Sequence, residues 1–203
     1  EPFEYNDRTR TLYAGADSVS AGKFAFTFPV PLDINYSDEP GLIILHAISH
    51  DKSIEAQGLF EDFLIGDTYI EEQTDTVGPT IAAYSDGHNT GEISITTTTP
   101  TIRITLYDEN GINTTGNGLG HDIIAIIDGK EALTYTLNSH YTQAIGDYRS
   151  GTVEYTLPTL PAGKHTLTVR AFDTLNNMGE GHYSFEAVEG LQEEYDIFDT
   201  AGR

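Results

Sequence analysis

The sequence lacks cysteine and tryptophan altogether, and basic residues are few. Without cysteine, this chain has no disulfide, zinc–thiolate site, iron–sulfur cluster or cysteine nucleophile. Its 32 Asp and Glu residues outnumber its 10 Lys and Arg residues, which gives a formal net charge of −22 over 203 residues. A field of that sign repels phosphate, so nucleic acid and anionic bilayers are excluded as main partners.

Long hydrophobic runs are also missing. The longest, residues 42–45, is far shorter than the ~20 apolar residues of a transmembrane helix, so we expect no membrane-spanning segment. The first residues show neither an initiator methionine nor a signal-peptide pattern, which indicates a mature product or a fragment of a longer protein. Aromatic residues are frequent by contrast, and 12 Tyr with 9 Phe can build a folded core.

Apolar and polar residues alternate with a period of two wherever a period can be read, which predicts half-buried strands. This alternation occurs in residues 24–28, 101–106, 153–157 and 166–171. Residues 42–48 and 123–127 are apolar on both faces and predict central strands that are covered on each side. Apart from the acidic tail at 191–199, no segment of ten or more residues has a helical period. The chain is therefore predicted to be all-β.

The turn signals and one change in composition predict tandem β-sandwich domains. Asp128-Gly129 lies between two strand patterns and is the strongest hairpin signal. Residues 66–79 are polar and acidic and end in Gly-Pro, as an exposed linker does. We therefore divide the chain into residues 1–70, a small β-sandwich or a partial sheet completed by upstream residues; 71–77, a linker; 78–190, an immunoglobulin-like β-sandwich; and 191–203, an acidic tail.

The second domain begins and ends with recognisable patterns. Residues 75–81 (DTVGPTI) and 168–177 (TVRAFDTLNN) resemble the opening linker and the last strand and turn of bacterial immunoglobulin-like domains. The Asp and Asn side chains of the closing pattern are expected to satisfy the backbone of the turn before the last strand. Residues 45–66 and 169–190 align without gaps but with slight identity, so the alignment either reflects two similar units in tandem or arises by coincidence.

Further stretches resemble one enzyme family. They are residues 26–36 (FTFPVPLDINY), 55–66 (EAQGLFEDFLIG), 108–123 (DENGINTTGNGLGHDI), 150–153 (SGTV) and 161–167 (PAGKHTL). These stretches resemble the region after the catalytic domain in gingipain-type cysteine endopeptidases that act as cell-surface sortases of the Bacteroidetes type IX secretion system. The resemblance covers most of residues 20–190. The Cys/His pair of that family matches nothing here, because the chain has no cysteine.

The resemblance implies an exported parent protein associated with the outer membrane at the cell surface. Such a parent removes C-terminal secretion signals from cargo proteins and transfers the cargo to lipopolysaccharide. This chain would then be no enzyme itself but an accessory scaffold of β-sandwiches that spaces or supports the peptidase domain. Its expected partners are that peptidase domain and other secretion-system proteins, with cargo proteins or lipopolysaccharide as further candidates.

The loop at residues 108–122 concentrates acids and amides among glycines. Hard oxygen ligands on a flexible backbone suit Ca²⁺, and Asp108, Asn110 and Asp122 are the candidate ligands. The spacing does not fit an EF-hand, because Ile112 occupies one ligand position and no Glu stands at the twelfth. Asn and Gly are also typical of a long structural loop. We prefer a structural or partner-contacting loop without a cofactor and keep calcium as the alternative.

Two other functions stay open. One is a cell-surface adhesin or carbohydrate-binding sandwich, although the absence of tryptophan counts against sugar stacking. The other is a glycosidase that uses adjacent acids such as Glu61-Asp62 or Glu71-Glu72. No serine-hydrolase, zinc-protease, phosphate-loop or dinucleotide pattern is present.

Overall fold

The computed structural model describes residues 11–34, 39–66, 75–85, 88–89, 94–116 and 120–191. These residues form twelve strands and two short 3-10 turns, η1 (Glu131–Leu133) and η2 (Asn138–His140). The predicted all-β sandwich fold is confirmed. Within the described ranges, no helix is long and apolar enough to cross a membrane.

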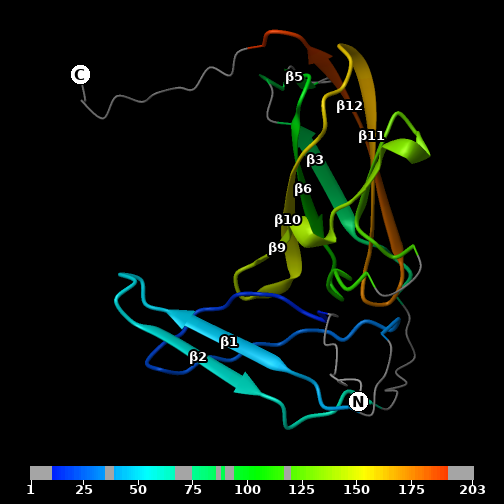
Figure 1. Cartoon of the computed structure of the whole chain (residues 1–203). Helices are drawn as coiled ribbons and strands as arrows, with labels where there is room; N and C mark the ends of the chain where they lie inside the picture. The colour runs from blue at the N-terminus through cyan, green and yellow to red at the C-terminus, as the bar shows by residue number, and fades with distance from the viewer. Residues whose placement is uncertain are drawn as a thin grey trace, which may run out of the picture.

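The sandwich consists of two sheets (Figure 1). The four-stranded sheet has the order β3 (Thr80–Ser85), β6 (Thr101–Tyr107), β10 (Asp147–Thr156) and β9 (Tyr141–Ala144). The six-stranded sheet has the order β4 (His88–Asn89), β5 (Ser94–Thr97), β12 (Met178–Val188), β11 (Gly163–Phe172), β7 (Ile124–Ile127) and β8 (Thr134–Thr136). Neighbouring strands are antiparallel except for the parallel pair of β5 and β12.

The core lies between the sheets and follows from the alternation in the sequence. In β6, Ile102, Ile104 and Leu106 are at most 1% exposed, while the residues between them face solvent. Strand β11 presents Leu167, Val169 and Ala171 to the same core in the same way. Complete burial of one such aliphatic side chain contributes about 1.5–3 kcal/mol. The core between the two sheets contains many of them and therefore contributes strongly to the stability of the sandwich.

Strand β7 confirms the prediction of a central strand, because it pairs with both β11 and β8. Coverage of both faces is not complete, because Ala125 and Ile127 are buried whereas Ile124 and Ile126 are only partly so. The turn after β7 contains the expected Asp128-Gly129 pair, whose φ angles are 53° and 62°. Positive φ at both central residues is the geometry of a tight hairpin turn, and it favours the Asp-Gly sequence.

The N-terminal part contains a two-stranded antiparallel sheet, β1 (Ile43–Ile48) with β2 (Glu55–Phe60) (Figure 1). The prediction that residues 42–48 are covered on both faces is wrong. Ile44 is 71% exposed and lies opposite Leu59, which is also 71% exposed. One face of this sheet is therefore open to solvent, because a two-stranded sheet has no second layer of its own over that face. It combines three apolar residues, Ile44, Ile48 and Leu59, with the polar residues His46, Glu55 and Gln57.

The strand predicted over residues 24–28 is also wrong, since that segment forms no ladder with the other described residues. The aromatic residues that alternate in this segment nevertheless lie next to one another in the structure. The rings of Phe24 and Phe26 stack with centroids 6.3 Å apart, and those of Phe26 and Phe28 are 6.1 Å apart. Tyr13 continues the stack at 4.6 Å from Phe28. Aromatic side chains on alternate residues thus pack against one another without strand pairing.

Both aligned segments, 45–66 and 169–190, contain a hairpin. The connection in the first, residues 49–54, is one residue longer than that in the second, residues 173–177. The first strands match without a gap, whereas the second strands are offset by one position. The similarity of the two segments is therefore one of local hairpin form.

Candidate functional site

Two loops meet at one end of the sandwich, one after β6 and one between β11 and β12. In the first, the Asn110 N–H donates to Asp108 Oδ1 over 2.8 Å, and the Gly111 N–H donates to the Asp108 carbonyl over 3.1 Å. Gly111 has φ of 93°, and a Cβ there would lie 2.9 Å from both Pro29 and Tyr148. The Asp-x-Asn-Gly sequence therefore encodes a tight turn whose glycine also admits the N-terminal segment.

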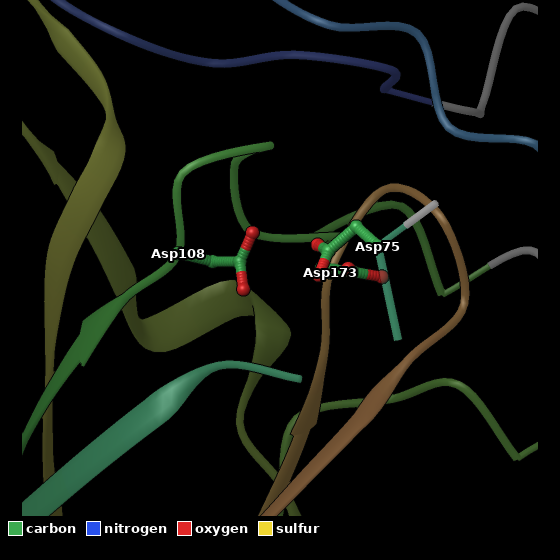
Figure 2. A group of neighbouring side chains, drawn as sticks. All are labelled: Asp75, Asp108 and Asp173. Atoms are coloured by element: carbon green, nitrogen blue, oxygen red, sulfur yellow. The ribbon is translucent and has the colours of Figure 1, made fainter. Parts of the chain in front are cut away.

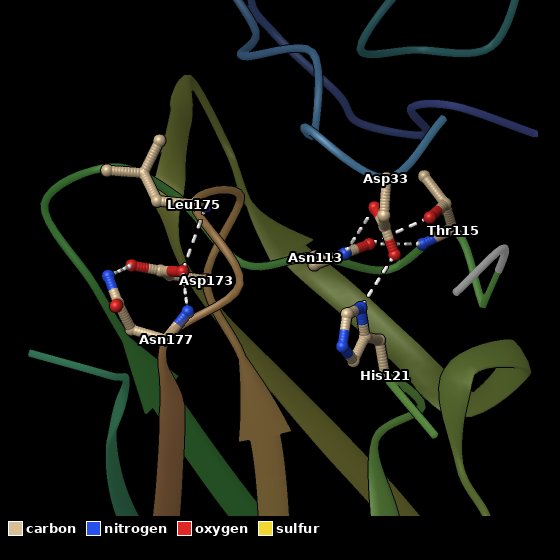
Figure 3. Close-up of polar contacts among 7 residues, drawn as sticks. All are labelled: Asp33, Asn113, Thr115, His121, Asp173, Leu175 and Asn177. Carbon is tan, nitrogen blue, oxygen red and sulfur yellow. Dashed lines mark hydrogen bonds and ion pairs between the residues drawn. The ribbon is translucent and has the colours of Figure 1, made fainter. Parts of the chain in front are cut away.

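The second loop is organised by one buried carboxylate. Asp173, with 0% exposure, accepts hydrogen bonds from the N–H groups of Leu175 at 2.9 Å and Asn177 at 2.7 Å (Figure 3). The Asn177 side-chain amide donates to the other carboxylate oxygen over 2.8 Å. This confirms that Asp and Asn of the closing pattern satisfy the turn before the last strand.

Three carboxylates from distant parts of the sequence come together between these loops. Oxygen atoms of Asp75, Asp108 and Asp173 all lie within 4.8 Å of one another (Figure 2). Asp75 is brought there by a close approach of two backbones: a Cβ on Gly179 would lie 2.1 Å from the Pro79 carbonyl oxygen. Only glycine fits at that crossing, so β12 fixes the position of the linker that carries Asp75.

Burial raises the pKa of the Asp108 carboxyl to about 6. The hydrogen bond from the Asn110 N–H opposes this shift, whereas the neighbouring charges of Asp173 and Asp75 add to it. Asp108 is only 6% exposed. The surroundings of Asp108 therefore disfavour its charged form and favour its protonation.

Most oxygens of the cluster already accept hydrogen bonds from the protein. Asp75 accepts from the Val77 N–H at 3.0 Å and from the Asn110 side-chain amide. With the three bonds to Asp173 and the one to Asp108, five of the six carboxylate oxygens have an N–H donor. These donors offset the mutual repulsion and give the cluster a structural role at the loop junction.

The three predicted calcium ligands do not lie together in the structure. Asp108 and Asn110 belong to the carboxylate cluster, whereas Asp122 is not a member of it and lies beside Gly116 instead. Burial raises the pKa of Asp122, and the charge of His121 opposes this shift. The sequence signals for Asp75 and Asp173 are the linker and the closing pattern, and both patterns indicate architecture rather than a binding site.

The loop after β6 also contacts residues 13–33, the N-terminal segment, through Asp33 (Figure 3). Asp33 Oδ1 accepts a hydrogen bond from the Asn113 side-chain amide at 3.0 Å, and Asp33 Oδ2 lies 2.9 Å from His121 Nδ1. Asn113 is completely buried, and its own oxygen accepts from the N–H and hydroxyl of Thr115. The His121 ring packs on Phe172 with centroids 4.5 Å apart. Each group around Asp33 is thus fixed by a second contact.

Other contacts join the N-terminal segment to the sandwich. The Leu32 N–H donates to the Thr174 carbonyl over 3.0 Å, and the Gly146 N–H donates to the Ala16 carbonyl over 2.9 Å. The Gln143 side chain donates to the Tyr13 hydroxyl over 2.7 Å. Residues 13–33 are therefore attached to the sandwich at four places: the loop after β6, strand β9, the turn between β9 and β10, and the loop between β11 and β12.

The adjacent acids considered for glycosidase chemistry do not belong to the carboxylate cluster. Glu61 and Asp62 are exposed and lie after β2, and Glu71 and Glu72 lie outside the described residues. The three clustered acids belong to hydrogen-bonded turns. The arrangement at this end of the molecule thus favours holding two parts of the chain together.

Comparison with known proteins supports the resemblance found in the sequence. No protein-family model matches the chain, and the curated proteins contain no significant match. Among solved structures, the chain is similar to dimeric latent PorU from Porphyromonas gingivalis, with 34% sequence identity and a TM-score of 0.56. The match covers 81% of this chain and 15% of the PorU chain. The chain is thus similar to a region that makes up a small part of PorU.

Proposed function

We propose that this chain is a non-catalytic scaffold region of a longer sortase of the type IX secretion system, and that it supports the peptidase domain of that protein. The observation that carries the proposal is the open face of the β1–β2 sheet, on which three large apolar side chains are exposed. Ile44, Ile48 and Leu59 on this face are 71%, 56% and 71% exposed. An exposed apolar surface of this kind is typical of an interface with another protein or domain.

The hydrogen bonds around Asp33 hold the segment of the chain that precedes this surface. They attach residues 13–33, which precede β1, to the loops of the sandwich. A support needs such a connection, because a domain docked on the β1–β2 sheet would otherwise move freely relative to the sandwich. Under this proposal the junction holds the segment that leads to the docking surface against the sandwich.

The peptidase chemistry of the parent would lie outside this chain, because the chain provides no cysteine. The parent is expected to be exported and to act at the cell surface in association with the outer membrane. Its peptidase domain is the first partner, with other secretion-system proteins, cargo proteins and lipopolysaccharide as further ones. The net charge of −22 would keep the region away from anionic lipopolysaccharide unless divalent cations bridge the two.

Calcium binding at residues 108–122 stays a prediction. The structure indicates a different set of candidate ligands from the one expected from the sequence. Asp108 and Asn110 would act together with Asp75 and Asp173, while Asp122 would not take part. Carboxylate and amide oxygens are suitable calcium ligands. The preferred interpretation is still a structural loop, because N–H groups of the protein already occupy five of the six cluster oxygens.

The scaffold proposal is tested by co-expressing this chain with the peptidase region of the same parent and purifying one through a tag on the other. The unmodified chain is expected to retain the peptidase region, and the double variant Ile44→Asp/Leu59→Asp is expected to lose it. Ile145→Asp is the matched control, because Ile145 is 76% exposed and lies between β9 and β10 of the sandwich. Retention by the double variant, or no association of the unmodified chain, would contradict the proposal.

A further inference from the structure

The outer face of the four-stranded sheet contains a groove with a volume of about 330 Å³. Its floor is a row with one small residue from each strand, aligned by the strand registers: Ala82, Thr105, Thr152 and Thr142. All four are exposed. The next row contains Tyr107, which is 42% exposed and lies between Thr80 and Ser150. The groove therefore runs across the strands, with an aromatic ring along one side.

No charged residue lines this groove, although 21% of all residues in the chain are charged. A phosphate or carboxylate ligand would meet no cationic side chain there, and the net charge of −22 would repel it. The lining itself offers a cation no carboxylate. The carboxylates beside it are already engaged, Asp147 with Ser150 and Arg149 and Glu154 with Arg103. The groove thus favours a neutral ligand on a strongly acidic protein.

The lining combines hydroxyl groups with apolar surface. Hydroxyls come from Thr80, Thr105, Thr142, Ser150, Thr152 and Tyr107. A hydroxyl can both donate and accept a hydrogen bond. Two of these already donate within the protein, Ser150 to Asp147 Oδ2 at 2.8 Å and Thr105 to the Ala82 carbonyl at 3.4 Å, and keep only their acceptor capacity. A purely apolar ligand would cover these groups without partners, at a cost of about 1–3 kcal/mol for each one left unsatisfied. The threonine methyl groups and the Tyr107 ring offer apolar contacts between them.

An extended peptide fits this surface less well. The central strands β6 and β10 are each paired on both sides, so the floor offers no free backbone N–H or C=O groups. A peptide lying across the strands could not pair with them as an added strand, which is the usual source of affinity on a sheet. Its own amide groups would depend on side-chain hydroxyls alone.

We propose that this groove binds a neutral oligosaccharide. Sugar hydroxyls match the donors and acceptors of the threonine and serine side chains, and the C–H faces of sugar rings match the methyl groups and the Tyr107 ring. Four strands span about 14 Å across the sheet, which accommodates a short oligosaccharide. The volume of about 330 Å³ lies at the lower end of the range for small-molecule sites. This site is independent of the β1–β2 surface proposed for the peptidase domain.

The test applies the purified chain to an array of neutral and acidic oligosaccharides, followed by calorimetric titration with the neutral member that gives the strongest signal. Trigalacturonic acid is the acidic probe of comparable size. We expect binding of neutral members and none of trigalacturonic acid. Tyr107→Ala is expected to weaken the titrated binding by at least about tenfold, which corresponds to ~1.4 kcal/mol.

Tyr84→Ala is the matched control. Tyr84 lies on the outer face of the same sheet and is 50% exposed, but it does not line the groove. This variant is expected to bind like the unmodified chain, and thermal melting of both variants verifies folding. The proposal is overturned if no neutral oligosaccharide binds, if acidic members bind better, or if the two variants have the same affinity.

Discussion

Asp33 and His121 lie 88 positions apart in the sequence, and Asp33 Oδ2 is 2.9 Å from His121 Nδ1. The carboxylate side chain is only 10% exposed, and its other oxygen accepts a hydrogen bond from the buried Asn113 side chain. A buried carboxylate with two such donors is costly to replace. This contact therefore connects the N-terminal segment to the sandwich more firmly than surface pairs do.

Asp33→Ala is expected to lower the free energy of unfolding by about 1–3 kcal/mol, because it leaves the buried Asn113 amide without its acceptor. Urea denaturation measures this change. Asp62→Ala is the control, since Asp62 is exposed and such substitutions usually alter stability by less than about 0.5 kcal/mol. Equal effects of the two substitutions would argue against a structural role for Asp33.

Asp173→Ala is expected to destabilise the sandwich by at least about 2 kcal/mol, because the N–H groups of Leu175 and Asn177 lose their acceptor. Asp173→Asn keeps one acceptor oxygen and should cost less. The order of the two variants in urea denaturation checks the assignment. Two variants with unchanged stability would show that the carboxylate does not organise the loop.

Gly179→Ala is expected to cost about 1–3 kcal/mol or more, because the new Cβ would lie 2.1 Å from the Pro79 carbonyl oxygen. Gly66→Ala is the matched control: no atom lies within 4 Å of its Cβ position, and its φ is not positive. The control should be neutral or slightly stabilising. Comparable melting temperatures for the two variants would contradict the close crossing of the linker and β12.

Stability should depend on pH through Asp108. Its pKa rises from the ordinary 3.8 to about 6 on burial, so the folded chain binds this proton more tightly than the unfolded chain. The stability that this proton contributes is complete below pH ~4 and is lost as the pH rises through about 6, at most ~3 kcal/mol. Relative to the unmodified chain, Asp108→Asn should therefore gain stability between pH 4 and 7. A pH-independent difference in urea denaturation with EDTA would contradict this.

Calcium titration followed by thermal melting separates the two interpretations of residues 108–122. We expect no change in the melting temperature, because the cluster oxygens already accept N–H groups. Calcium bound at 100 times its Kd would instead add about 2.7 kcal/mol. If such a shift appears in the unmodified chain and is absent in Asp75→Asn, the calcium interpretation replaces the structural one.

The sequence predicted those features that depend on local pattern. Alternation identified the buried faces of β6 and β11, and Asp128-Gly129 identified a hairpin, because both signals follow from backbone geometry within a few residues. Alternation does not say which partner covers a face. The Phe24–Phe28 pattern therefore predicted a strand where the structure shows stacked rings without a ladder.

The site was less predictable, because its contacts join residues that are far apart in the sequence. The loop of Asp108 and Asn110 was identified from its composition, but Asp75 and Asp173 reach it only through the folded sandwich. Asp33 was part of a stretch that resembled the sortases and gave no sign of its contact with His121. Nothing local separates such a buried carboxylate from the many exposed acids of this chain.

The central claim, a fixed connection between the N-terminal part and the sandwich, is tested most directly by a distance measurement between two spin labels. The chain has no native cysteine, so Val30→Cys in the N-terminal segment and Lys164→Cys on β11 label only those sites. Both positions are exposed. Double electron–electron resonance should give one narrow distance distribution, which broadens when Asp33→Ala is added. A distribution that is already broad with Asp33 intact would contradict the account.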